Sequence, residues 1–193
     1  MGDTLRFAAV LVLVVLCLVQ ASVPVRADNP NDLKSLMVYG RDWIFAVREP
    51  DGWLGDTGSC AADEGVNILF LPAGKTMGTS DVNVSIVVWQ KTDDDLGQDL
   101  AIDMQRYKKQ YPKIRFSDFS AHDDCCTTWS KVYYYAGRQD WTVYVNPGRG
   151  YKWYAVISLE TQTGTPSTAE LAALREIVAT FKPLNFKIRA PSN

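Results

Sequence analysis

The chain has 193 residues, of which 47% are hydrophobic and 22% are charged, and its formal net charge is −2. A charge so near neutral gives no argument for nucleic acid or an anionic membrane surface as the partner, and we expect neither. The composition is that of a globular protein with enough apolar residues for a core.

The start of the chain has the pattern of a secretory signal peptide over residues 1–27. Arg6 precedes an unbroken apolar run over residues 7–19, and the small-residue cleavage motif "VRA" ends at Ala27. The run is shorter than the roughly 20 residues that span a bilayer. We therefore expect export, to a periplasm or outside the cell, without stable membrane insertion after cleavage. The mature part, residues 28–193, is expected to form a single domain.

The first elements of the mature part are predicted from short local signals. Asn31 can cap a short helical turn whose apolar residues are Leu33, Leu36 and Met37. The segment "DWIFAVREPDGW" predicts one strand that ends at Pro50. Residues 66–71 and 82–89 are near-continuous apolar runs, which predict strands covered on both faces.

The period then becomes helical, because apolar residues fall on one stripe: Leu96, Leu100, Met104, Tyr107 and Tyr111. Asp94 or Asp95 can cap this helix, and Pro112 ends it. Four further strands are predicted, at 114–119, 129–135, 141–146 and 151–159, with "AGRQD" and "NPGRG" as the turns between the last three.

A second helix is predicted near the end of the chain. Ser167 and Glu170 have the spacing of a capping box. An apolar stripe follows, made by Leu171, Leu174, Ile177, Val178 and Phe181. Because hairpin-length links favour antiparallel pairing and each amphipathic helix needs a sheet face, the order of elements predicts an α+β fold. We expect an antiparallel sheet of about six or seven strands sandwiched by helices.

Several of these segments together resemble the PsbP-like family. The resemblance rests on "FAVREPDGW", "GVNILFLPAG", "VNVSIVVWQ", "LGQDLAIDMQRYKKQYP" and "ELAALREIVATFKPL", and it covers roughly residues 41–184. The fold of that family is shared by an extrinsic protein of photosystem II and by a nuclear-import factor that binds the GTPase Ran. The resemblance implies a sheet between helices and a non-enzymatic binding or accessory role. It assigns no functional residue here, and the cysteines are not part of the family pattern.

The only histidine and two adjacent cysteines fall in "AHDDCCTTWS", residues 121–130. Exported cysteines first predict disulfides, so we expect Cys60 to pair with Cys125 or Cys126. That bridge closes a loop of about 65 residues and leaves one thiol unpaired. The alternative is a metal site, with His122, Asp124 and Cys125 as the main candidates and Asp123, Cys126 or the distant Cys60 as further ligands. Consecutive side chains point in different directions in an extended chain, which argues against a metal site made from these neighbouring residues.

Enzymatic signatures are incomplete in this sequence. His122 is the only candidate histidine base, so a thiol hydrolase or redox enzyme would have to use it with Cys125 or Cys126. There is no G-x-S-x-G motif, and the Gly74-Lys75-Thr76 segment lacks the first glycine of a P-loop, where Leu69 stands. We expect no catalytic residue and no cofactor.

Aromatic and basic residues concentrate in the last three predicted strands and their turns. The interpretation is a ligand-binding surface made by Tyr133, Tyr135, Arg138, Trp141, Tyr144, Arg149, Tyr151 and Trp153. Core packing is the competing interpretation, because alternation along a strand sends Tyr133 and Tyr135 to one face and Tyr134 to the other. The sequence thus predicts an exported, non-enzymatic binding or accessory protein with a protein, peptide or glycan partner.

Overall fold

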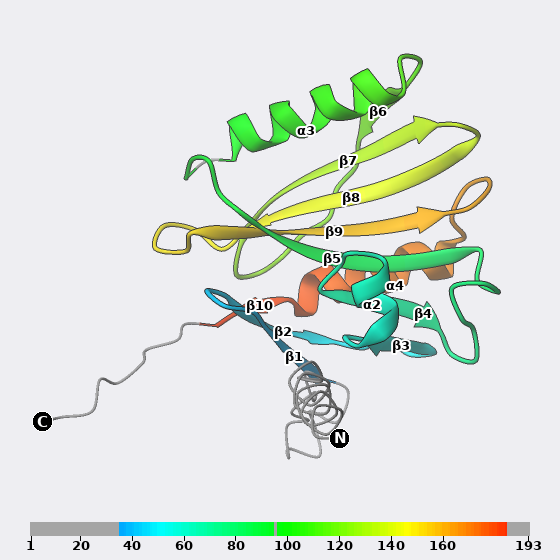
Figure 1. Ribbon diagram of the computed structural model, residues 1–193, viewed down its shortest axis with the longest axis horizontal. Helices are drawn as coiled ribbons and strands as arrows, with labels where there is room; N and C mark the ends of the chain where they lie inside the picture. The colour runs from blue at the N-terminus through cyan, green and yellow to red at the C-terminus, as the bar shows by residue number, and fades with distance from the viewer. Residues whose placement is uncertain (1–34, 95, 185–193) are drawn as a thin grey trace, which may run out of the picture.

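The computed structural model describes residues 35–94 and 96–184, drawn in colour in Figure 1. The signal peptide expected over residues 1–27 lies outside the described residues, as do Asn31 and Leu33. In the described part, no helix has both the length and the apolar character that crossing a membrane requires.

Two antiparallel sheets organise the described residues. The larger has seven strands in the spatial order β3 (Trp53–Asp56), β4 (Ile68–Pro72), β5 (Val82–Gln90), β9 (Trp153–Thr161), β8 (Arg138–Asn146), β7 (Thr127–Tyr135) and β6 (Arg115–Asp118). The smaller consists of β1 (Ser35–Tyr39), β2 (Ile44–Arg48) and β10 (Lys182–Pro183). Every described strand pair is antiparallel, which confirms the predicted pairing and the α+β class.

Three helices are described: α2 (Ser59–Asp63), α3 (Gly97–Gln110) and α4 (Thr168–Thr180). In Figure 1, α2 lies in front of the larger sheet and α4 behind it. The alternation of β4 agrees with this placement, because Ile68 and Phe70 join the main core with α4, whereas Leu69 and Leu71 pack with Ala61 of α2. The apolar run of β4 is therefore covered on both faces, as predicted, whereas the same prediction for β5 is wrong, because Trp89 at its end is 49% exposed.

Helix α3 covers the β7 and β8 end of the sheet face that α2 covers at the β4 end. Its predicted apolar stripe is confirmed: Leu96 and Leu100 are buried against Tyr144 and Tyr154, on β8 and β9. Further along, Tyr107 packs on Tyr133 of β7, with ring centroids 4.7 Å apart. Because large aromatic side chains separate α3 from the strands, the helix stands off the sheet.

The start of α3 differs from the prediction. Leu96 is the N-cap, in a left-handed conformation with φ of 58°, and no side chain caps the helix. The predicted Asp94 cap is therefore wrong, and Asp95 lies outside the described residues. The carboxylate of Asp99 instead turns back and accepts a hydrogen bond from the backbone N–H of Thr92 at 3.1 Å.

The N-terminal predictions also need correction. Residues 35–39 form β1 and not a helical turn, because Leu36, Met37 and Val38 pair with β2. The segment "DWIFAVREPDGW" forms two strands in different sheets, β2 and β3, joined through the turn after Pro50. A short apolar segment carries too little periodicity to reveal a partner that lies elsewhere in the chain.

The first of the two predicted hairpin turns is shorter than expected. Only Ala136 and Gly137 form it, with φ of 49° and 79°, as two-residue hairpins require. Arg138, Gln139 and Asp140 therefore belong to β8, and their side chains alternate between the two faces of the sheet.

The predicted capping box of α4 is confirmed. Ser167 Oγ accepts the Glu170 N–H at 3.3 Å, and Glu170 Oε2 accepts the Ser167 N–H at 2.7 Å. We expect Ser167→Ala to lower the free energy of unfolding by about 1 kcal/mol, because two N–H groups lose their acceptors or their alignment. Urea denaturation measures the change. Thr168→Ala, one residue inside the helix, is the control; an equal loss there would contradict the capping role.

Candidate functional site

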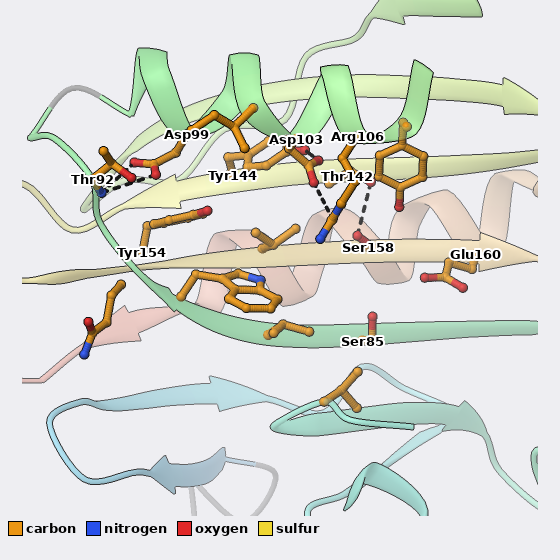
Figure 2. Close-up of a pocket in the computed structure, with 17 residues that line it drawn as sticks. Ser85, Thr92, Asp99, Asp103, Arg106, Thr142, Tyr144, Tyr154, Ser158 and Glu160 are labelled. Carbon is orange, nitrogen blue, oxygen red and sulfur yellow. Dashed lines mark hydrogen bonds and ion pairs between the residues drawn. The ribbon is translucent and has the colours of Figure 1, made fainter. Parts of the chain in front are cut away.

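A groove of about 360 Å³ crosses the face of the larger sheet that α2 and α3 share. Strands β5, β9 and β8 form its floor, and α3 forms one wall (Figure 2). Val66, which follows α2 and packs on the cluster that includes Ala61, also lines the groove. The groove exists because α2 covers β3 and β4 and α3 covers β7 and β8, so the centre of this face stays open.

A row of hydroxyl groups crosses the floor. Ser85 on β5 pairs directly with Ser158 on β9, which pairs directly with Thr142 on β8. Directly paired residues present their side chains on the same face, so the three hydroxyls lie side by side. Thr142 Oγ1 and Ser158 Oγ are 3.1 Å apart and hydrogen-bonded (Figure 2). This row offers both donors and acceptors at positions fixed by strand pairing.

One end of the groove is apolar and exposed. Four large hydrophobic residues are exposed in the described part of the chain, and two of them, Trp89 (49%) and Ile102 (52%), line the groove. Trp89 on β5 pairs directly with Tyr154 on β9, so two aromatic side chains lie next to each other on the floor. Such rings, exposed at one end of a concave site, are typical of ligand contact surfaces.

Asp103 on α3 holds the wall of the groove in place. Its carboxylate accepts hydrogen bonds from the phenol groups of Tyr133 and Tyr144 and forms an ion pair with Arg106. Burial raises the pKa of both tyrosines, so they remain protonated donors at neutral pH. The Arg106 side chain is itself 62% exposed, and Figure 2 shows it beside the strands.

The other end of the groove holds a carboxyl group that titrates near neutrality. Burial raises the pKa of Glu160 to about 7, with a further increase from Asp140 and an opposing effect from Arg138. Glu160 on β9 pairs directly with Asp140 on β8, which explains their coupling. Asp140 is 2% exposed and accepts a hydrogen bond from Tyr135. Near pH 7, Glu160 can therefore donate as well as accept a hydrogen bond.

The eight residues predicted as one aromatic-basic surface do not form one. Alternation places Tyr133, Tyr135, Arg138 and Tyr144 on the α3 side of the sheet, where Tyr133 and Tyr144 are each only 1% exposed. The other aromatic members, Trp141, Tyr151 and Trp153, belong to or pack on the core on the α4 side. Arg149 is exposed in the loop between β8 and β9.

Two of these predicted residues line a second, wider hollow of about 940 Å³. Tyr151 and Trp153 lie there beside Tyr39, Arg41 and Lys152. Its rim consists mostly of loop and turn residues. The groove, in contrast, has its polar groups fixed by paired strands and by a helix, which is the arrangement that preorganised binding requires.

Sequence reasoning missed the residues that matter most in the groove: Trp89, Ile102, Ser85 and Glu160. Ile102 carried a usable signal, because it is an apolar residue off the buried stripe of its helix. Apolar residues in such positions are exposed unless a partner covers them. Glu160 carried no comparable signal, since its burial depends on which strand lies beside β9.

The cysteine loop has an arrangement that the sequence did not reveal. His122 pairs with Asp124 at 3.2 Å, and both side chains are exposed, at 84% and 91%. Asp123 is buried, and the sulfur atoms of Cys125 and Cys126 are 2.7 Å apart. The candidate ligands His122 and Asp124 therefore point into solvent and away from a shared site with the thiols.

The structure does not bring Cys60 together with Cys125 or Cys126, and all three are free thiols. Cys60 lies in α2 on one side of the larger sheet, whereas Cys126 packs against the core on the other. The expected bridge is thus not formed, because the sheet lies between its partners. Burial, with a contribution from Asp123, raises the pKa of the Cys125 thiol to about 11, and burial also raises that of Cys126. Neither is an activated nucleophile.

No protein-family model matches this chain, and no curated protein matches it either. The resemblance to the PsbP-like family therefore stays a prediction, and the functional argument rests on the groove and the cysteine loop.

Proposed function

We propose that this chain is an exported, non-enzymatic binding protein whose groove between α2 and α3 holds a short saccharide. Export, to a periplasm or the cell exterior, is supported by the sequence pattern of residues 1–27. We also propose the helix–sheet–helix sandwich of the PsbP-like family, because α2 and α3 pack on one face of the larger sheet and α4 on the other.

The observation that carries the proposal is the exposure of Trp89 and Ile102 in the same groove. An apolar side chain that is half exposed in a concave site gains free energy when a ligand covers it. The apolar face of a sugar ring can stack on Trp89 and Tyr154, because a flat array of C–H groups matches an aromatic surface.

The polar part of the groove favours a neutral, hydroxyl-rich ligand. Ser85, Ser158 and Thr142 provide hydroxyl groups that donate and accept, and Glu160 and Arg106 provide hydrogen-bonding groups at the edges. Three acidic residues, Asp99, Asp103 and Glu160, line the groove with one arginine. The excess of acidic groups disfavours phosphate-rich ligands such as nucleic acids, because like charges repel. A purely apolar lipid chain is disfavoured because it would bury the row of hydroxyl groups without hydrogen-bond partners.

The same groove lacks the paired free carboxyl groups of a glycoside hydrolase. Asp103 is already held by two phenols and an arginine, and Asp99 accepts the N–H of Thr92. Glycoside hydrolysis needs one acid and a second carboxylate free to act as base or nucleophile. Among the described residues that line the groove, only Glu160 meets that requirement, which supports binding without hydrolysis.

Trp89→Ala tests the proposal directly. Di- and trisaccharides that quench or enhance the tryptophan fluorescence of the native chain are titrated into both proteins. We expect the variant to bind at least about 10-fold more weakly, equivalent to about 1.4 kcal/mol of lost stacking. Its fold should persist, because this side chain is half exposed.

Leu54→Ala is the matched control, since Leu54 is 57% exposed on β3 and does not line the groove. It should leave the affinity unchanged. Equal affinities for the native chain and Trp89→Ala, or an absence of binding across the saccharide panel, would refute the assignment.

A further inference from the structure

The loop before β7 buries a carboxylate that its surroundings do not fully satisfy. Asp123 is 3% exposed, and its Oδ1 accepts the backbone N–H of Cys125 at 2.8 Å. Its second oxygen, Oδ2, is also shielded from solvent and is reached by no N–H or O–H donor of the described residues, so the thiols of Cys125 and Cys126 are the donors beside this carboxylate. A buried carboxylate oxygen without a donor or counter-charge is strongly unfavourable, so this atom requires a partner.

Two sulfur atoms lie next to this carboxylate. A carboxylate oxygen of Asp123 and the sulfur atoms of Cys125 and Cys126 all lie within 4.8 Å of one another. Cys126 is half-buried against the core, while Cys125 is exposed, with its sulfur 3.5 Å from the backbone oxygen of Phe181. The loop thus holds three metal-ligating side chains together, with one side open to solvent.

We propose that Asp123, Cys125 and Cys126 form a binding site for a thiophilic divalent cation of the zinc type. Thiolate sulfur and carboxylate oxygen are both ligands that Zn²⁺ accepts, and its fourth position can hold a water molecule on the exposed side. As the ion binds, each thiol releases its proton to solvent and forms one metal–sulfur bond. The two thiolates balance the charge of the ion, so the Asp123 carboxylate is stabilised by its direct bond to the metal and the site as a whole carries one negative charge.

Binding requires the two sulfur atoms to move apart. At Zn–S distances of about 2.3 Å and tetrahedral angles, two sulfur ligands are about 3.8 Å apart, whereas those of Cys125 and Cys126 are 2.7 Å apart. Because Cys125 is exposed, rotation of its side chain can supply this movement. The site therefore adjusts at its outer ligand, while Asp123 and Cys126 are held by the protein interior.

A disulfide between the adjacent cysteines fits the close sulfur atoms but not the carboxylate. Such a bond has no donor and no positive charge to offer Oδ2 of Asp123, so the buried oxygen would keep its unfavourable environment. A cation satisfies all three side chains at once. The position of Asp123, and not the sulfur distance, favours the metal.

The test is a titration of the reduced full chain with Zn²⁺ in competition with a chromophoric chelator, and a second titration with Co²⁺. We expect one ion per chain, with a thiolate-to-cobalt charge-transfer band, and tighter binding as the pH rises because protons compete for sulfur. Cys125→Ser and Cys126→Ser should weaken binding by more than the roughly 10- to 100-fold that loss of an outer-shell group costs. Asp123→Asn should weaken it in the same direction.

Cys60→Ser and Asp124→Asn are the matched controls, because one removes a thiol on the other side of the sheet and the other an exposed neighbouring acid. Both should bind like the native chain. Cys125→Ser changes an exposed side chain, so its result can be interpreted even if Asp123→Asn does not fold. The proposal would be overturned if the reduced chain did not bind Zn²⁺. This applies equally to a chain that is isolated with a Cys125–Cys126 disulfide and reduced before the titration. Losses of Zn²⁺ affinity in the control variants as large as those in the cysteine variants would also overturn it.

Discussion

Phe181→Ala is expected to lower the free energy of unfolding by about 3–5 kcal/mol, the usual cost of removing a buried aromatic ring. Phe181 is 1% exposed. Its ring stacks on Phe45 of the smaller sheet, with centroids 4.9 Å apart, and meets the edge of Trp153 of the larger sheet at 6.4 Å. The substitution therefore opens a cavity at the point where α4 and both sheets meet.

Equilibrium urea denaturation, followed by circular dichroism, measures this loss. Trp89→Ala serves as the comparison because it removes a larger aromatic side chain from a half-exposed position. Trp89→Ala should lower the free energy of unfolding by much less than Phe181→Ala does. If Phe181→Ala cost less than about 1 kcal/mol, the packing between the two sheets would differ from the arrangement described above.

The second large effect concerns pH. The pKa of Glu160 rises from 4.5 to about 7 on folding, mainly through burial. Between these values the folded chain holds more protons than the unfolded chain, so the free energy of unfolding falls as the pH rises through this window. Glu160→Gln removes this titration. Across this pH window, we expect the free energy of unfolding of the variant to fall by roughly 1–2 kcal/mol less than that of the native chain. One pKa unit corresponds to about 1.4 kcal/mol, and partial exposure screens the charge, which reduces the effect.

Urea denaturation at a series of pH values compares the native chain with Glu160→Gln. The pKa of Asp140 is also raised by burial, so a shallower decline should remain in the variant. Glu64→Gln is the control, because Glu64 is exposed and affects Glu160 only through a distant charge. Parallel stability curves for the native chain and Glu160→Gln would show that the carboxyl is not buried in the folded protein.

Local patterns were sufficient for the elements whose periodicity is long. The capping box of α4, the stripe of α3 and the apolar run of β5 each combine several residues that agree, and each is present in the structure. The segment around β1 and the division between β2 and β3 failed because their pairing depends on chain segments that are far apart in sequence. Strand β10, for example, follows α4 and pairs with β2.

The candidate sites were harder to predict than the fold. The sequence drew attention to residues 121–130, but it could not show that Asp123 is buried while His122 and Asp124 face solvent. In the same way, the crowding of tyrosines indicated a surface, although alternation and the position of α3 bury Tyr133 and Tyr144. Burial of one particular side chain depends on what packs over it, and a single sequence does not contain that information directly.

The floor of the groove alternates with the core along the same strands, and this has a consequence for how the protein can change. Ser85 lies between the buried Val84 and Ile86, and Ser158 lies between the buried Ile157 and Leu159. The residues of the proposed binding groove and the residues of the hydrophobic core thus alternate along a shared backbone. A substitution on the floor therefore changes the chemistry of the proposed groove while the core residues on the other face of the same strands keep their packing.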